Sequence, residues 1–143
     1  MTETVAIAAD HAGFELKEIL KSELVSQGRE VLDLGTTGTQ SVDYPDFAER
    51  LAKALNEGRA RCGVLVCGTG IGISIAANRH RNVRAALCHD SVSARMARAH
   101  NDANVLALGA RLIGTEVAKD CLRVFLDTPF EGGRHAARVA KLT

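Results

Sequence analysis

The sequence is poor in aromatic residues and has no tryptophan. Phenylalanine and tyrosine together make up 3% of its 143 residues. A chain of this kind offers little of the flat surface on which proteins stack single-stranded nucleic-acid bases. The formal net charge is only +1, so charge does not predict binding to nucleic acid or to a membrane surface either.

Long apolar runs and paired cysteines are also missing. No segment approaches the length of about 18 apolar residues that a membrane-spanning helix needs, and the first residues carry no run typical of a signal peptide. The four cysteines include no CxxC pair, which disfavours a disulfide framework and a zinc site. We therefore expect a cytoplasmic chain with reduced thiols, folded as a single domain over residues 1–143.

What the sequence does contain is a regular alternation of short apolar runs and amphipathic segments. In the helical segments, charged residues such as Lys17 stand between the apolar ones. This alternation predicts an α/β fold, a three-layer doubly wound sandwich with a Rossmann-like, five-stranded parallel sheet. Five strands favour the flavodoxin-like order 2-1-3-4-5. The expected strands cover residues 5–9, 31–34, 64–67, 84–88 and 105–108, and the expected helices 14–24, 45–55, 73–78, 91–100, 115–126 and 134–141.

Several polar residues follow the carboxyl ends of the expected strands, where open α/β sheets bind their ligands. Asp10 and His11 follow the first strand, and Cys67 ends the third. We expect these side chains to share one rim of the sheet. His100 and Asn101 stand instead at the end of a helix, in a polar cluster before the fifth strand.

A glycine loop follows Cys67 directly, with Gly68, Gly70 and Gly72 at alternate positions. Such a loop lets backbone N–H groups approach a ligand closely, and the helix that follows adds its positive end. The pattern is typical of a site for an anion or a developing oxyanion. It is neither a Walker loop nor a good dinucleotide fingerprint, and a plain tight turn between strand and helix remains the alternative.

Cys67 can be interpreted in two ways. The positive end of a helix favours the thiolate, which makes a cysteine at this position a usable base or nucleophile. The alternative is a buried, inert cysteine, which is how we interpret Cys62, Cys88 and Cys121.

Arg134 and Arg138 are four residues apart and so lie on the same face of the last expected helix. Two neighbouring guanidinium groups match a phosphate well. An ordinary charged helix face is the alternative interpretation.

Five segments together resemble the type B ribose-5-phosphate isomerases, a family that also includes allose-6-phosphate and galactose-6-phosphate isomerases. The resemblance extends over essentially the whole chain. The segments are ADHAGFELK at 9–17, DYPDFA at 43–48, CGTGIGISIAANR at 67–79, AHNDANVLALGAR at 99–111 and EGGRHAARV at 131–139.

The resemblance implies specific roles in an aldose–ketose isomerisation that needs no metal or other cofactor. Cys67 would move a proton between C1 and C2, and His100 would open the furanose ring, with Asp10 as its complement. Thr69 would hydrogen-bond the sulfur or a substrate hydroxyl. One branch of the family uses a glutamate base four residues further along, where this chain has the apolar Ile71. The substrate-binding residues would be Asp10, His11, Gly68, Thr69, Gly70, Ile71, Gly72 and Asn101 for the sugar and enediolate, and Arg111, Arg134 and Arg138 for the phosphate.

The resemblance also implies a homodimer with a shared active site, and it leaves open whether dimers pair into tetramers. His100, Asn101 and Arg111 would reach across from a partner subunit. The substrate is a small sugar phosphate; ribose 5-phosphate is expected, while allose 6-, galactose 6- and erythrose 4-phosphate need the same chemistry.

Two other classes of protein are alternatives to this interpretation. A flavodoxin-like receiver domain needs an aspartate at the end of the third strand, where this chain has Cys67. A non-catalytic nucleotide-binding module would use the glycine loop for phosphates and leave Cys67 idle.

Overall fold

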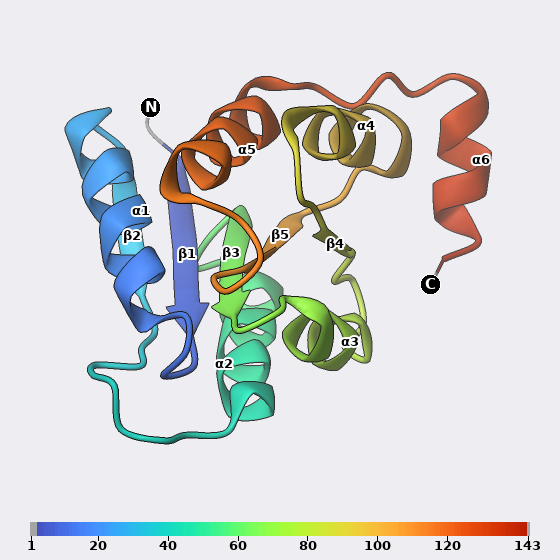
Figure 1. Ribbon diagram of the computed structural model, residues 1–143. Coiled ribbons are helices and arrows are strands. Elements are labelled where there is room, and N and C mark those ends of the chain that lie inside the picture. Colours follow the sequence, from blue (N-terminus) through green and yellow to red (C-terminus); the bar gives the residue numbers. More distant parts are fainter. Residues whose placement is uncertain (1–2, 143) are drawn as a thin grey trace.

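The computed structural model describes residues 3–142 and contains a parallel five-stranded sheet with helices on both faces (Figure 1). The alternation of strands and helices predicted from the sequence is confirmed. The strands are β1 Thr4–Ala9, β2 Glu30–Asp33, β3 Cys62–Cys67, β4 Ala85–Leu87 and β5 Val105–Gly109. The helices are α1 Phe14–Ser26, α2 Tyr44–Asn56, α3 Ile71–Asn78, α4 Ser91–Asn101, α5 Thr115–Asp127 and α6 Arg134–Ala140.

The strand order is β2-β1-β3-β5-β4, so the predicted order 2-1-3-4-5 is wrong in its last two positions. All four strand pairs are parallel, and β5 rather than β4 pairs with β3. Every residue of β5 is buried, whereas the three residues of β4 are only partly buried. A strand buried on both faces is stable between two neighbours, which explains why β5 lies inside the sheet and the short β4 forms its edge.

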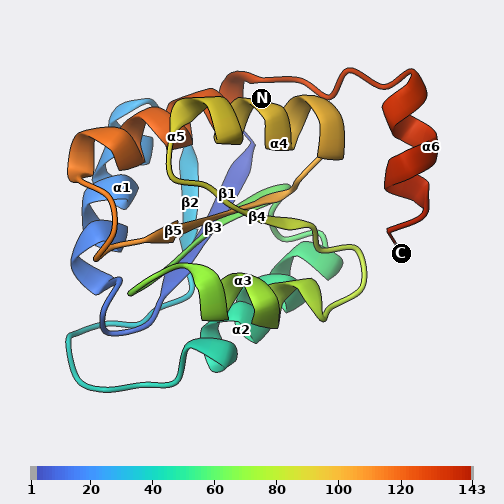
Figure 2. The ribbon, with the colours of Figure 1, turned by 45° about the vertical axis from the view of Figure 1, so that its right-hand side comes forward.

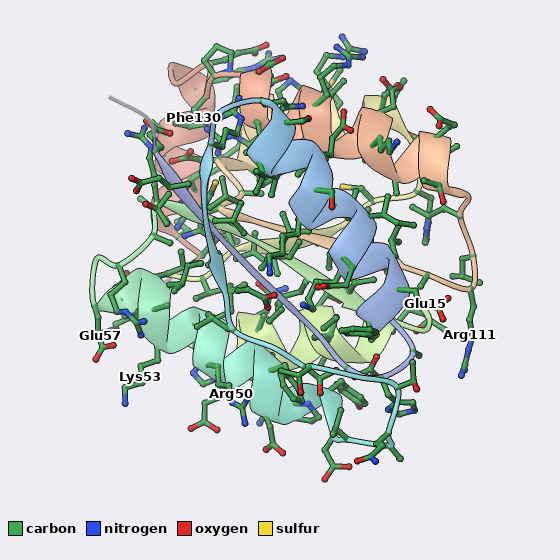
Figure 3. The ribbon with its side chains drawn as sticks, turned by 90° about the vertical axis from the view of Figure 1, so that its left-hand side faces the viewer. Glu15, Arg50, Lys53, Glu57, Arg111 and Phe130 are labelled. Carbon is green, nitrogen blue, oxygen red and sulfur yellow. The ribbon has the colours of Figure 1, made fainter. Side chains whose placement is uncertain are left out.

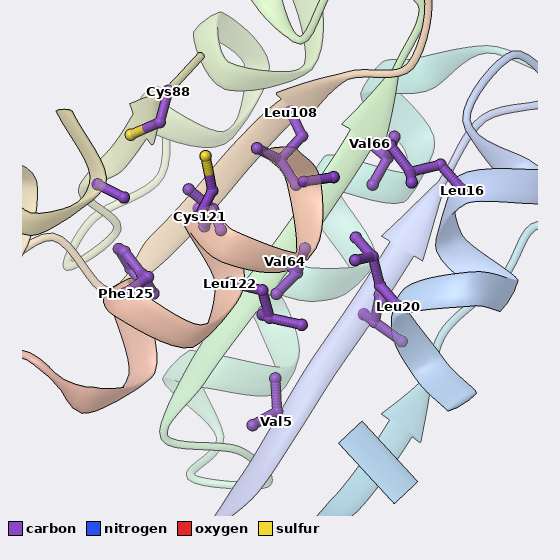
Figure 4. Close-up of a cluster of buried hydrophobic side chains, with 14 of the residues drawn as sticks. Val5, Leu16, Leu20, Val64, Val66, Cys88, Leu108, Cys121, Leu122 and Phe125 are labelled. Atoms are coloured by element: carbon purple, nitrogen blue, oxygen red, sulfur yellow. The ribbon is translucent and has the colours of Figure 1, made fainter. Parts of the chain in front are cut away.

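Two hydrophobic cores cover the two faces of the sheet. Helices α1, α4 and α5 pack on one face, and α2 and α3 pack on the other (Figure 2). Figure 4 shows the first core, where side chains of α1 and α5 such as Leu20, Leu122 and Phe125 meet Val5 and Val64 of the sheet. Burying such side chains contributes roughly 1.5–3 kcal/mol each, so the layers are held mainly by this packing.

Lys17 departs from the amphipathic pattern of α1. The pattern predicts a solvated lysine, but the side chain is only 1% exposed. Its Nζ lies 2.9 Å from Asp33 at the end of β2 and 2.7 Å from Glu18. Burial pushes the pKa of Asp33 upward, but hydrogen bonds from Lys17 and from the Gly35 N–H outweigh it, and the pKa is lowered overall. The ion pair thus ties α1 to the end of β2.

Helix α6 stands outside the sandwich. It packs against α4 and stands apart to one side of the sheet (Figure 1). Among residues 3–142, no helix is long and apolar enough to cross a lipid bilayer.

Candidate active site

The carboxyl ends of β1 and β3 bring Asp10 and Cys67 to the same edge of the sheet, as predicted. The backbone N–H of Asp10 donates to the carbonyl of Val66 over 3.2 Å, which fastens the loop after β1 to β3. Gly13 allows this approach, because a Cβ at that position would overlap the Val66 carbonyl oxygen. Both loops therefore form one continuous wall.

A pocket of about 390 Å³ opens at this edge. This volume falls in the range of sites for small organic ligands. The pocket contains a thiol, a carboxyl, an imidazole and a guanidinium group within one concave surface. Its lining residues are Asp10, His11, Ala12, Tyr44, Cys67, Gly68, Thr69, Ile71, Gly72 and Arg111.

The glycine turn after Cys67 places a hydrogen-bond donor on the sulfur. Gly70 has φ 76°, a left-handed conformation that favours glycine, and its N–H donates to Cys67 Sγ over 3.1 Å. A Cβ on Gly70 would also lie 2.5 Å from Leu87 Cδ1. The hydroxyl oxygen of Thr69 accepts the Ile71 N–H at 3.2 Å, and the hydrogen bond to the sulfur comes from the Gly70 backbone. A hydrogen bond from Thr69 to a substrate hydroxyl stays a prediction.

The surroundings of Cys67 differ from those of the other three cysteines. Cys67 lines the pocket, and its sulfur accepts a hydrogen bond next to the amino end of α3. Burial raises the pKa of Cys62 and of Cys121 to about 11, and it also raises the pKa of Cys88. Figure 4 shows Cys88 and Cys121 within the apolar core. Those three cysteines therefore remain neutral thiols at neutral pH.

Asp10 and His11 are held in fixed orientations beside the thiol. Asp10 is 6% exposed, and its Oδ1 accepts the Gly13 N–H at 3.1 Å. Nδ1 of His11 accepts the backbone N–H of Val42 at 3.1 Å. In a neutral imidazole this bond leaves the proton on Nε2, so His11 can donate from that atom.

Arg111 follows β5 and supplies the positive charge of the pocket. Its backbone N–H donates to the Gly68 carbonyl over 2.9 Å, and its side chain extends from the body of the protein (Figure 3). Arg111 lines the pocket of its own chain, in contrast to the expectation that it reaches across from a partner subunit.

The remaining predicted residues lie elsewhere. His100 and Asn101 end α4, while Arg134 and Arg138 stand on α6, and none of the four lines the Cys67 pocket. Because α4 runs back from the carboxyl edge, it ends near the amino edge, where the Asn104 carbonyl accepts the N–H of Gly63 in β3. Within one chain, the predicted site residues therefore form two separate groups.

Two residues beside His100 were not predicted from the sequence as site residues. The rings of His100 and His135 are stacked with centroids 4.2 Å apart, and Glu131 Oε1 lies 3.7 Å from Nε2 of each ring. The pKa of His135 is lowered, mainly by burial and further by the nearby His100 and Arg134. Glu131 and His135 are four residues apart, a spacing at which two side chains can meet. No local pattern, however, reveals that both of them contact His100 on α4.

A larger hollow of about 450 Å³ at the amino edge of the sheet is a weaker candidate. Its arginines already have carboxylate partners, so their charge is largely compensated within the chain. These ion pairs are Arg29–Asp127, Arg61–Glu3, Arg84–Asp102 and Arg98–Asp102.

Comparison with protein families gives a match over residues 5–142 to the model described as Ribose/Galactose Isomerase. Among curated relatives, ribose-5-phosphate isomerase B of Escherichia coli is 45% identical, over 97% of this chain and 93% of its own length. The D-erythrulose-4-phosphate isomerase of Pectobacterium atrosepticum is also 45% identical, over 97% of this chain and 92% of its own.

Solved structures agree with this similarity. A ribose 5-phosphate isomerase from Thermotoga maritima superimposes with a TM-score of 0.97 at 51% identity, covering 99% of this chain and 98% of that one. Ribose-5-phosphate isomerase B of Clostridium thermocellum gives a TM-score of 0.96 at 49% identity, covering 97% of this chain and 94% of that one.

Proposed function

Because this chain belongs to the ribose/galactose isomerase family, a family of sugar-phosphate isomerases, we propose that it interconverts ribose 5-phosphate and ribulose 5-phosphate. Cys67 is the base of the reaction, and residues 1–143 act as one isomerase domain. The observation that carries the proposal is the hydrogen bond from Gly70 N–H to Cys67 Sγ at a pocket of suitable size.

The proton transfer follows from that arrangement. The Cys67 thiolate removes the proton from C2, and the negative charge moves to O1 as the enediolate forms. The O2 hydroxyl passes its proton to O1, and the Cys67 thiol returns its own proton to C1, which leaves the ketone at C2 and regenerates the thiolate. The amino end of α3 and the N–H groups of the turn from Gly68 to Gly72 stabilise the enediolate oxygens.

Ring opening precedes this step when the substrate is a furanose. His100 gives a proton to the ring oxygen O4 as the bond between C1 and O4 breaks, and Asp10 takes the proton of the O1 hydroxyl. Asn101 and His11 hydrogen-bond the sugar hydroxyls. Arg134, Arg138 and Arg111 bind the phosphate, and this remote binding fixes C1 and C2 against the thiolate.

These roles require two copies of the chain. His100, Asn101, Arg134 and Arg138 lie apart from the Cys67 pocket within one chain, so a second copy would have to bring them to it. The surface on both sides of the edge strand β4 supports such an interface. There α3 exposes Ile71 and Ile75, and α4 exposes Val92 and Met96, at 48%, 58%, 55% and 37% respectively.

A second candidate substrate has specific support. The relative named D-erythrulose-4-phosphate isomerase is as similar to this chain as the relative named ribose-5-phosphate isomerase B. The alternative function is therefore isomerisation of another aldose phosphate, namely erythrose 4-, allose 6- or galactose 6-phosphate, by the same residues.

The test compares kcat/KM for these four aldose phosphates in the wild type and in Cys67→Ala. Loss of general acid–base catalysis should lower kcat at least about a hundredfold, with little change in the thermal unfolding midpoint. Cys62→Ala is the matched control and should keep wild-type turnover, because its sulfur lies away from the pocket. Near-wild-type turnover in Cys67→Ala would sink the mechanism, and the highest kcat/KM decides among the substrates.

A further inference from the structure

Three side chains from two segments of the chain form a compact group, which we call the imidazole–carboxylate cluster: His100, Glu131 and His135. The two rings are nearly parallel, with 12° between their planes and 4.2 Å between their centroids. The Glu131 carboxylate lies 3.7 Å from Nε2 of both rings. His100 is 39% exposed, whereas the His135 side chain is only 10% exposed. His100 is therefore the accessible ring and His135 its buried support.

The main chain around the cluster holds this arrangement in place. The backbone N–H of Glu131 donates to the Ala99 carbonyl over 3.0 Å. One residue earlier on α4, Arg98 Nε donates to the Thr128 carbonyl over 3.2 Å. These two bonds fasten the segment before α6 along the end of α4. Glu131 and His135 are thus fixed with respect to His100 by the backbone, and their contact does not depend on their side chains alone.

The charges around the cluster assign different parts to the two rings. Three charged groups besides His100 face His135: Glu131, Arg134 and Arg138. Burial and the neighbouring positive charges lower the pKa of His135, which therefore stays neutral near pH 7. His100 is the ring that is free to exchange a proton with a substrate. It stands in the last turn of α4, where its side chain is 39% exposed.

The orientation of the rings disfavours a metal site at the same place. The nitrogen, oxygen and nitrogen atoms lie within 4.8 Å of one another, which is close enough to consider an ion. A metal bound by imidazole nitrogen lies in or near the plane of the ring. Two nearly parallel planes stacked face to face do not share such a point, so both rings cannot bind one ion without leaving the stack.

We propose that His135 and Glu131 are positioning residues for His100, holding its ring in the orientation that delivers a proton to O4 of the furanose. The stack fixes the plane of the His100 ring, and the Glu131 carboxylate draws the Nε2 proton toward one side of it. The inference rests on the proposed function, in which His100 opens the sugar ring. It assigns to the cluster the ring-opening step alone and not the proton transfer at Cys67.

Ring opening can be measured separately in the Cys67→Ala background, where isomerisation is blocked. Each opening and reclosure of the furanose exchanges the α and β anomers of ribose 5-phosphate: the bond between C1 and O4 breaks, and it re-forms on either face of C1. NMR exchange spectroscopy measures this rate without consuming the sugar. We expect Cys67→Ala to accelerate the exchange above its rate in buffer.

Two further substitutions, each added to Cys67→Ala, test the cluster. His135→Ala removes the ring that stacks on His100. Glu131→Gln removes the charge at a side chain that is 60% exposed, so it should not impair folding. Each should lower the exchange rate at saturating sugar by at least about tenfold, with little change in the concentration that half-saturates it. His80→Ala, at a histidine in the turn after α3, is the matched control and should leave the rate unchanged.

The outcomes separate the inference from the function on which it rests. If Cys67→Ala does not accelerate anomer exchange, the ring-opening role of His100 fails and the positioning role fails with it. If it does, and both cluster variants match His80→Ala, only the positioning role is overturned. A weaker affinity with an unchanged saturated rate would also overturn it, because that result indicates displacement of the arginines on α6 and no effect on His100.

Discussion

The four cysteines illustrate how the environment of a single residue decides its chemistry. Cys67 is as buried as Cys88 by exposure, at 4% and 2%, yet the two sulfurs have different surroundings. Both side chains belong to buried apolar clusters, but Cys67 also lines the pocket and accepts the Gly70 N–H, whereas Cys88 does not line that pocket. Amino-acid composition cannot distinguish these two cysteines. The glycine turn that follows Cys67 in the sequence can, because it supplies the N–H group that donates a hydrogen bond to the sulfur.

A labelling experiment checks this difference. In the folded protein at pH 8, iodoacetamide should modify Cys67 first, and Cys62, Cys88 and Cys121 much more slowly. With pKa values of about 11, Cys62 and Cys121 have on the order of 0.1% thiolate at that pH. Peptide mass spectrometry locates the modified residue. Labelling of all four cysteines at similar rates would contradict the assignment, and protection of Cys67 by ribose 5-phosphate would place the label in the substrate site.

At the scale of elements, the site depends on the junction between β3 and α3. A strand that ends at Cys67 and a helix that begins at Ile71 leave only three residues for the turn. Gly70 completes it in the left-handed conformation while lying against Leu87 and the backbone at Leu108. The turn therefore needs glycine for two independent reasons, its backbone conformation and the lack of space.

Gly70→Ala should accordingly destabilise the fold and weaken catalysis together. The left-handed conformation costs a non-glycine residue about 1–2 kcal/mol, and overpacking adds about 1–3 kcal/mol. The two terms together predict a loss of about 2–5 kcal/mol in the free energy of unfolding measured in urea. We also expect a lower kcat, because the donor to Cys67 moves. Gly38→Ala is the control, since a Cβ there meets nothing within 4 Å, and it should change the unfolding free energy by under about 0.5 kcal/mol. Equal effects of the two substitutions would argue against a strained turn.

At the scale of the whole molecule, the proposed reaction needs more than one chain. The pocket with Cys67, Asp10 and Arg111 lies at the carboxyl edge of the sheet, and His100 lies where α4 approaches the amino edge. No rotation of a side chain spans this separation. A homodimer that pairs the pocket of one subunit with the α4 and α6 helices of the other is the simplest closed arrangement.

Mixing two inactive variants tests the shared site. Cys67→Ala and His100→Asn should each be nearly inactive on ribose 5-phosphate when refolded alone. Refolded together in equal amounts, half of the dimers are mixed, and each mixed dimer has one intact site, so about one quarter of wild-type activity should return. Activity no higher than that of the separate variants would show that Cys67 and His100 act within one chain, or not together at all.

The sequence by itself determined the elements, their alternation and the rim at which Cys67 lies. These follow from local patterns, because apolar spacing marks strands and helices, and parallel strands bring their carboxyl ends to one edge. Asp10, His11, Cys67 and the glycine turn could be placed together for this reason. The spacing of Arg134 and Arg138 suggested a phosphate site but left an ordinary charged helix face as the alternative, and the family resemblance favoured the phosphate.

Only the tertiary structure decided the strand order, the burial of Lys17 and the separation of His100 from Cys67. It also revealed the contact of His100 with Glu131 and His135. Each of these depends on which segments pack against one another. That packing is determined by the burial of whole helices and strands and not by any short stretch of sequence. The alternation of strands and helices is compatible with β4 or β5 beside β3, and only the complete burial of β5 selects between them.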